Sequence, residues 1–292
     1  MKKLQQNEIR IRDPFIFLEE DTYYLYGSTD KNTWTGSGNG FQMYKSSDLK
    51  QFEGPFEVFH PEPDFWGMEN YWAPEISKYK GCYYMTASFK GEKGRGVQLL
   101  QADSPKGPFI PIRNQAITPE KWDCLDGTCY ANGDSVYLIF CHEWTQVTDG
   151  EVCIALLSKD MDYLQTSVTT LFKASEAEWT IENNEYNKKG YVTDGPYVVS
   201  LQNGELAMIW SSYSKSGYSI GVSYSKEGIY GPWEHSKELL YDKDGGHGMI
   251  FRNKRNQMFL IIHSPNSWMD ERIKLLEIQE ADGKIRIIGG II

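Results

Sequence analysis

Short apolar runs alternate with polar turns along the whole chain. Five runs of four or five residues are rich in Tyr, Phe, Leu, Ile or Met and follow turn signals such as Asn132-Gly133-Asp134; they are Tyr23–Tyr26, Tyr83–Ala87, Val136–Phe140, Leu206–Trp210 and Met258–Ile262. Runs of this length between turn residues predict buried β-strands. Apolar residues rarely recur at the spacing of a helix face, so we expect no long helices.

A further strand-like run follows each of these at a similar distance: Gln42–Tyr44, Val97–Leu100, Val152–Leu156, Ser219–Ser223 and Ile273–Leu276. Similar phrases then begin at Ser46, Ser104, Ser158 and Ser225, where side chains are expected to bond nearby backbone and turn the chain into an outer strand. We therefore predict an all-β fold, a five-bladed β-propeller with about four antiparallel strands per blade and a single domain over residues 1–292. A two-sheet sandwich is the alternative.

One polar residue heads each predicted repeat. The five are Asp13, Glu75, Asp126, Asp194 and His247, and successive members lie about 50 to 70 residues apart. If each begins an innermost strand, all five converge at one mouth of the axial channel. Four carboxyl groups and one imidazole this close would push their pKa values apart, as acid–base catalysis requires. Any single acid here reads as a turn residue, but a polar residue in all five repeats favours a site.

Composition narrows the range of partners. Asp and Glu number 40 against 30 Lys and Arg, which gives a net charge of −10. Such a surface repels phosphate backbones, so no nucleic-acid partner is expected, whereas a neutral sugar is unaffected. The five cysteines form no Cys-x-x-Cys pair and are expected to be free thiols in a reducing compartment. Without a signal-peptide core or an apolar span, the sequence predicts a cytoplasmic protein, or one whose leader has been removed, and no membrane partner.

Four phrases in this order and spacing resemble glycoside hydrolase family 43: Arg12-Asp13-Pro14-Phe15, Tyr71-Trp72-Ala73-Pro74-Glu75-Ile76, Leu125-Asp126-Gly127-Thr128 and Asp194-Gly195-Pro196-Tyr197. The resemblance covers nearly the whole chain and implies inverting hydrolysis of α-L-arabinofuranosyl or β-D-xylosyl linkages in plant-type glycans or their oligosaccharides. It implies that Asp13 is the general base and that Asp126 orients the general acid and tunes its pKa. Asp194 falls at the general acid, and His247 matches an axial histidine near a bound cation or water cluster.

One departure from that family puts catalysis in question. Asp194 stands where the family usually has Glu, and its side chain is one methylene shorter, although proton transfer needs heavy atoms within roughly 2.6–3.2 Å. Either the backbone lies closer and Asp194 is the acid, which the retained Gly-Pro-Tyr context favours, or Glu143 or Glu75 supplies the proton. The third alternative is a non-catalytic carbohydrate-binding propeller. The long approach Glu182–Tyr186 suggests compensating loop changes.

Aromatic residues near the predicted mouth are candidate sugar platforms. We expect Trp34, Trp66 and Trp144 to bind substrate together with Glu75, Glu143 and His247, and Trp72 to be a core residue. A ring face suits the apolar face of a sugar, although packing between blades is the alternative for each ring. The resemblance implies a small or polymeric carbohydrate substrate and no required cofactor. It allows a structural Ca²⁺ at the axis, which His247 would reach through water.

Overall fold

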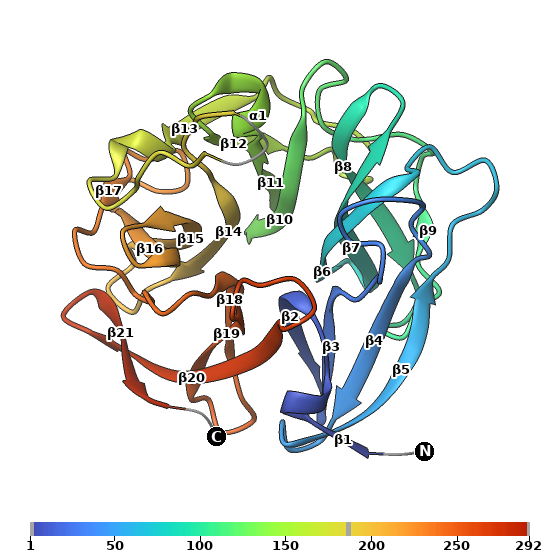
Figure 1. The fold of residues 1–292 in the computed structure, drawn as a ribbon, viewed down its shortest axis with the longest axis horizontal. Coiled ribbons are helices and arrows are strands. Elements are labelled where there is room, and N and C mark those ends of the chain that lie inside the picture. Colours follow the sequence, from blue (N-terminus) through green and yellow to red (C-terminus); the bar gives the residue numbers. More distant parts are fainter. Residues whose placement is uncertain (1–2, 185–187, 291–292) are drawn as a thin grey trace.

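Five antiparallel sheets surround a central axis in the computed structural model, which describes residues 3–184 and 188–290 (Figure 1). One edge strand of each sheet lies nearest the axis, and each of these five strands contacts its neighbour on either side. The innermost strands are β2 (Arg12–Glu19), β6 (Glu69–Tyr79), β10 (Cys124–Asn132), β14 (Asp194–Ser200) and β18 (Gly246–Arg252). The predicted five-bladed propeller is thus confirmed.

Each blade adds its later strands outward in chain order. Blade one continues with β3 (Thr22–Ser28), β4 (Phe41–Ser46) and β5 (Gln51–Phe59), and blade two with β7 (Cys82–Gly91), β8 (Gly94–Ala102) and β9 (Ile110–Pro111). Blade three has β11 (Ser135–His142), β12 (Glu151–Leu156) and β13 (Thr169–Lys173); blade four has β15 (Leu206–Ser214), β16 (Gly217–Ser225) and β17 (Glu234–His235). Blade five has β19 (Met258–Ser264), β20 (Arg272–Ala281) and β21 (Lys284–Gly289). Blade one gains a fifth strand, β1 (Lys3–Gln5), on β5.

All ten apolar runs singled out in the sequence lie within second or third strands. The serine phrases turn the chain as expected: Ser46 Oγ accepts the Leu49 N–H at 2.9 Å, and Ser158 Oγ accepts the Asp162 N–H at 3.0 Å. Helix is limited to α1 (Trp144–Val147) and the 3₁₀ turns η1 (Gln6–Glu8) and η2 (Ala174–Glu176) across the described ranges. No helix there has the length and apolarity to cross a membrane.

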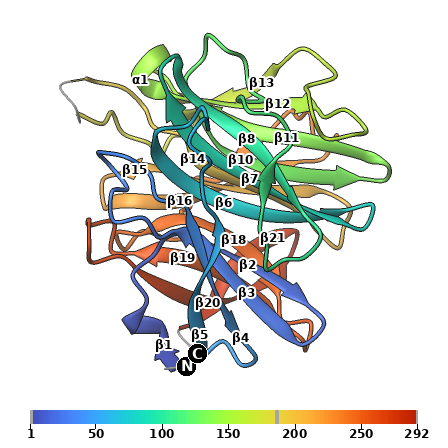
Figure 2. The same cartoon turned by 90° about the vertical axis from the view of Figure 1, so that its right-hand side faces the viewer.

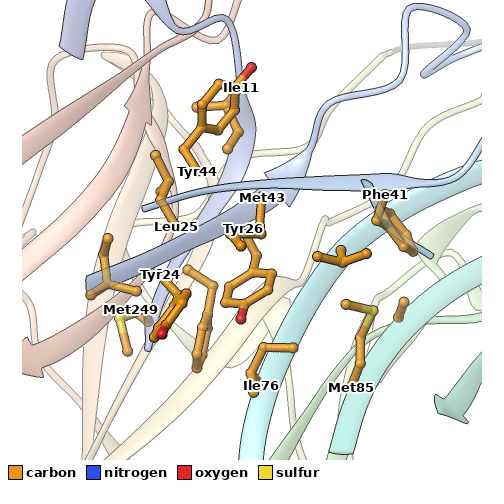
Figure 3. Close-up of a cluster of buried hydrophobic side chains, with 14 of the residues drawn as sticks. Ile11, Tyr24, Leu25, Tyr26, Phe41, Met43, Tyr44, Ile76, Met85 and Met249 are labelled. Atoms are coloured by element: carbon orange, nitrogen blue, oxygen red, sulfur yellow. The ribbon is translucent and has the colours of Figure 1, made fainter. Parts of the chain in front are cut away.

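Apolar side chains fill the spaces between blades. Figure 3 shows one such cluster, in which Leu25 and Tyr26 of blade one lie near Ile76 and Met85 of blade two and Met249 of blade five. Figure 2 shows the twisted sheets from the side. They pack face to face, so that each sheet buries both of its surfaces against its neighbours. The five cysteines are free thiols, so the fold rests on packing.

An ionic contact joins the first and last blades. Glu271, which precedes β20 and is fully buried, receives Arg12 Nη1 at 3.1 Å and Arg10 Nε at 3.4 Å. The Ile11 N–H also donates to the Glu271 carbonyl oxygen at 3.3 Å. These bonds fix the chain just before β2, and therefore fix the place at which Asp13 enters the axis.

Candidate active site

The inner strand of every blade carries a bulge at the same place. Between Arg12 and Phe15 in β2, and at the corresponding point of the other inner strands, the chain has one residue more than the strand that it pairs with. The first bulged residue has left-handed backbone angles in all five cases: φ is 49° at Asp13, 48° at Ala73, 55° at Asp126, 52° at Gly195 and 40° at His247. Bulges re-aim side chains, so these five positions are the equivalent ones around the axis.

This register corrects the predicted equivalence of the five polar residues. Asp13, Asp126 and His247 share the bulge position, but Ala73 and Gly195 occupy it in blades two and four. Asp194 lies one residue before that position. Glu75 lies two residues after the bulge position. The residues equivalent to it in the other blades are Phe15, Thr128, Tyr197 and Met249.

Second-strand side chains of the preceding blade fix four of the five bulges. Each accepts the N–H of a bulge residue: Ser28 Oγ from Ala73 at 2.9 Å, Ser88 Oγ from Asp126 at 2.8 Å, Ser211 Oγ from His247 at 2.9 Å and His263 Nδ1 from Asp13 at 3.2 Å. These bonds satisfy buried backbone donors and tie each blade to the next. Four of the left-handed residues at the axis are therefore held by the blade that precedes their own.

His247 joins the two aspartates that share its position. Its Nδ1 lies 3.3 Å from Oδ1 of Asp13 and 3.4 Å from Oδ2 of Asp126, and all three side chains are buried. The other oxygen of Asp13 accepts the Ser28 hydroxyl at 2.5 Å, while Oδ2 of Asp126 also accepts the Gly195 N–H at 3.0 Å. Residues from four blades thus meet around one imidazole.

Asp194 reaches this centre from the neighbouring strand position. Its Oδ2 accepts the Tyr218 hydroxyl at 2.9 Å. The residue after it, Gly195, packs so closely on the imidazole that a Cβ there would lie 2.7 Å from Cδ2 of His247. The other four blades carry non-glycine residues in the same left-handed conformation, so it is the histidine ring that requires a glycine at this point.

The environment displaces the carboxyl pKa values in opposite directions. Burial by itself would raise the pKa of Asp13, but the charges of His247 and Arg12 beside it hold that pKa below its ordinary value. Burial, together with Asp13, raises the pKa of Asp126 well above its ordinary value, although the Gly195 N–H opposes this rise. Burial and then Asp126 raise the pKa of Asp194 well above the usual range. The cluster therefore holds one carboxyl with a lowered pKa and two with raised pKa values, a separation of the kind that acid–base catalysis uses.

These residues line a cavity of about 650 Å³ at the axial mouth. Of the sequence-predicted residues, the cavity brings together Asp13, Asp126, Asp194, Trp34, Glu143, Trp144 and His247. Trp66 and Glu75 are absent from its lining among the described residues, and the substrate contacts expected of these two stay predictions. The Trp66 indole instead donates to Gln98 at 3.0 Å and packs against Gly91 within blade two.

Comparison with known proteins identifies the family. The family model described as glycosyl hydrolases family 43 matches residues 7–277. The chain belongs to glycosyl hydrolase family 43. It is a glycoside hydrolase, and its resemblance to that family in sequence is confirmed. No match was found among curated proteins.

Solved structures superpose over nearly the whole chain. An endo-arabinase from Bacteroides thetaiotaomicron VPI-5482 is 37% identical, with a TM-score of 0.89 over 96% of this chain and 98% of that one. A thermostable family-43 glycoside hydrolase is 23% identical, with a TM-score of 0.83 over 96% and 93%. An α-L-arabinofuranosidase from Lactobacillus brevis is 16% identical, with a TM-score of 0.75 over 93% and 91%. The last two likenesses concern the fold.

Stacked rings and guanidinium groups form one wall of the cavity in this family 43 enzyme. Arg12 lies 4.8 Å over Trp34, Trp34 meets Trp72 edge-on at 5.4 Å, and Arg95 lies 4.3 Å over Trp72. Trp72 was expected in the core, but it lines the cavity. Its indole N–H donates to the Thr33 carbonyl, which holds the ring upright against Trp34.

Glu143 is committed to Arg95 on the same wall. The Arg95 guanidinium donates to Glu143 Oε2 and, at 3.1 Å, to Asn70 Oδ1. Burial raises the pKa of Glu143, and Arg95 opposes that rise. A carboxyl in an ion pair is poorly suited to give up a proton as a general acid, so Glu143 is the weaker alternative to Asp194.

Sequence reasoning missed several residues of the site. Arg12, Arg95, Tyr218 and Trp268 all line the cavity. Arg12 had a signal in its place beside Asp13, but Tyr218 comes from a third strand and Trp268 from the loop between β19 and β20, where no motif marks them. Of the approach loop Glu182–Tyr186, Asn183 lines the cavity, and residues 185–187 lie outside the described residues.

The donor set at the axis fits a directly bound metal poorly. Ca²⁺ takes six to eight oxygen ligands, yet no group of three or more His, Cys, Asp or Glu side chains is placed to hold an ion in residues 3–184 and 188–290. Nδ1 of His247 is already engaged by two carboxyl groups. An axial Ca²⁺ held through water by His247 stays a prediction, and no catalytic step below depends on it.

Proposed function

We propose that this enzyme hydrolyses α-L-arabinofuranosyl linkages with inversion, in arabinan or in oligosaccharides derived from it. The observation that carries the mechanism is the cluster of Asp13, His247 and Asp126 with Asp194 beside it at the base of one cavity. The arabinose preference is supported by the 37% identity to the endo-arabinase, which aligns over 96% of the chain. A β-D-xylosyl substrate is the competing choice within the same chemistry.

In this mechanism Asp13 is the general base. Its lowered pKa keeps it ionised at neutral pH, so it can take a proton from the water that attacks the anomeric carbon. Ser28 and His247 hold its two oxygens and so aim the carboxylate into the cavity. An inverting enzyme leaves room for this water by separating base and acid by about 6.5–9.5 Å.

Asp194 is the general acid that protonates the departing oxygen. Burial and the charge of Asp126 keep its proton at neutral pH. The N–H of Gly195 favours the ionised form of Asp126 against the effect of burial, and the charge of an ionised Asp126 raises the pKa of Asp194. Tyr218 orients the Asp194 carboxyl by donating to it at 2.9 Å.

A non-catalytic carbohydrate-binding propeller is the second candidate, favoured by the Asp at the position where the family usually has Glu. A substrate panel separates the two: nitrophenyl α-L-arabinofuranoside, nitrophenyl β-D-xyloside and arabino-oligosaccharides, with the product anomer followed by ¹H NMR. Initial release of the inverted anomer from the arabinosides supports the proposal. Binding without turnover on every substrate would establish the second candidate.

The place of action follows from the same substrate. We expect a cytoplasmic enzyme that acts on short oligosaccharides already taken up by the cell, as the sequence predicts. Faster turnover of arabinotriose than of polymeric arabinan would agree with this expectation.

A further inference from the structure

The hydrogen bonds that fix the bulges are interrupted in one blade. The accepting side chains all stand at one second-strand position, opposite the residue that precedes the bulge; the five residues there are Ser28, Ser88, Cys141, Ser211 and His263. In four blades this residue accepts the bulge N–H of the next blade. In blade three it is Cys141, and the next bulge residue, Gly195, donates to the Asp126 carboxylate instead.

A cysteine at this position differs from a serine in its strength as a hydrogen-bond acceptor. A thiol sulfur is a weak acceptor, whereas a hydroxyl oxygen is a good one. Burial, followed by Asp126 and Asp194, raises the pKa of the Cys141 thiol well above its ordinary value. A neutral thiol therefore stands beside both carboxyls and does not compete for the Gly195 N–H.

We propose that Cys141 is a positioning residue for Asp126: by standing where other blades have a strong acceptor, it leaves the Gly195 N–H to the Asp126 carboxylate. Its kinetic consequences rest on the proposed function. The bond favours the ionised form of Asp126, and an ionised Asp126 in turn raises the pKa of its neighbour Asp194.

Cys141→Ser tests this inference against Cys141→Ala. A serine hydroxyl at the same position already receives a bulge N–H at 2.8–2.9 Å in three other blades. The serine variant should therefore draw the Gly195 N–H away from Asp126, whereas alanine offers no acceptor. Cys153→Ser is the matched control, because Cys153 is also fully buried in blade three and its thiol contacts Thr170 rather than the site.

In the full chain we expect Cys141→Ser to lower kcat by roughly tenfold or more, the worth of a charged hydrogen bond, with little change in KM. The acid limb of kcat/KM should move to higher pH, because Asp126 loses a donor to its ionised form. Cys141→Ala and Cys153→Ser should stay within about threefold of wild type in kcat. A Cys141→Ser variant like wild type, or an equal fall in Cys141→Ala, would overturn the inference.

Amide NMR provides a readout that needs no turnover. The Gly195 amide shift should follow the titration of Asp126 in wild type and in Cys141→Ala, and should lose that response in Cys141→Ser. A retained response in Cys141→Ser overturns the inference even in an active enzyme. Absence of turnover in wild type on every substrate would overturn the proposed function alone, since the amide titration still decides the role of Cys141.

Discussion

Nδ1 of His247 lies 3.3 Å from Oδ1 of Asp13, across the junction at which the fifth blade meets the first. The contact is possible because both residues occupy the left-handed bulge position of their strands. Burial raises the pKa of Asp13. The charge of His247 makes the largest contribution to lowering it, and the charge of Arg12 makes the next largest. The junction that closes the ring is therefore also the junction that holds the pKa of Asp13 below its ordinary value.

Asp13→Asn should abolish turnover while preserving the site. The amide keeps the shape of the side chain but cannot accept a proton from water, so we expect kcat to fall by about 10²–10⁴ on nitrophenyl α-L-arabinofuranoside. Calorimetric titration with arabinotriose should give a Kd close to that of wild type. A variant that retains near wild-type kcat would remove Asp13 from the role of base.

Asp194→Ala should affect substrates according to their leaving groups. A natural oligosaccharide needs protonation of the departing oxygen, so its kcat should fall by about 10²–10⁴. The dinitrophenolate group of a dinitrophenyl glycoside departs without a proton, so kcat on that substrate should fall far less. The alkaline limb of its pH profile should vanish, because that limb reports loss of the Asp194 proton. Equal losses on both substrates would point to a structural defect instead.

The matched control for that experiment is Glu143→Gln. If Glu143 were the acid, its variant and not that of Asp194 would show the dependence on the leaving group. We expect Glu143→Gln to weaken substrate binding through the loss of its ion pair with Arg95, at similar cost for both leaving groups.

Gly195→Ala should displace His247. The new Cβ would lie 2.7 Å from the imidazole, in a backbone conformation that alanine tolerates at a cost of about 1 kcal/mol or more. Kcat should fall at least tenfold, a loss of the size that a misplacement near one ångström can cause. Stability by chemical denaturation should fall by about 1–3 kcal/mol.

Gly133→Ala separates the effect of the steric clash with His247 from the effect of backbone strain. Gly133 has φ of 59°, close to the 52° of Gly195, and a Cβ there would meet no heavy atom of the described chain within 4 Å. This variant should lose about 1 kcal/mol of stability and no activity. If it loses as much activity as Gly195→Ala, the contact with His247 is not the cause.

The strand pattern was predictable because each strand is a contiguous run with its own turn. Tyr23–Tyr26 and Leu206–Trp210 needed no information beyond their own residues and flanking Gly and Asn. The repeat as a whole then specified the propeller, and convergence at the axis followed from the propeller alone. Asp13 and Asp126 could be placed for that reason.

The register of the site was not predictable in the same way. A bulge adds one residue whose backbone conformation carries no fixed residue type, so Ala73 and Gly195 stand at places equivalent to Asp13. Aligning the repeats on their polar residues gave Glu75 and Asp194 the bulge position. In the structure Glu75 lies two residues after that position and Asp194 one residue before it. Side chains from third strands and loops, such as Tyr218 and Trp268, reach the cavity through tertiary packing that no local pattern records.

Glu75 should make stability fall as pH rises. Burial raises its pKa to about 8 in the folded protein, well above that of an unfolded glutamate. Its proton is therefore held more tightly in the folded state, so stability is full below the unfolded pKa and declines up to about pH 8. The total decline attributable to this group is on the order of a few kcal/mol.

Urea denaturation of wild type and Glu75→Gln at pH 5 and pH 8 measures this effect. The glutamine variant cannot ionise, so the drop between the two pH values should be smaller in the variant than in wild type. Its turnover should remain near wild type, because Glu75 does not line the cavity in the described structure. Identical drops in both proteins would show that Glu75 does not titrate in this range.

Trp268→Ala should weaken binding of long substrates without affecting chemistry. The ring is 58% exposed and lines the cavity, an arrangement that suits stacking on a sugar beyond the cleaved bond. Covering such a ring stabilises the complex by about 1–2 kcal/mol, so KM for arabinopentaose should rise roughly tenfold while kcat on the nitrophenyl arabinofuranoside stays unchanged. Tyr163→Ala removes a ring of similar exposure that does not line the cavity in the described structure, and it should change neither value. A loss of the same size on the short substrate would place Trp268 at the scissile bond instead of at a distal sugar.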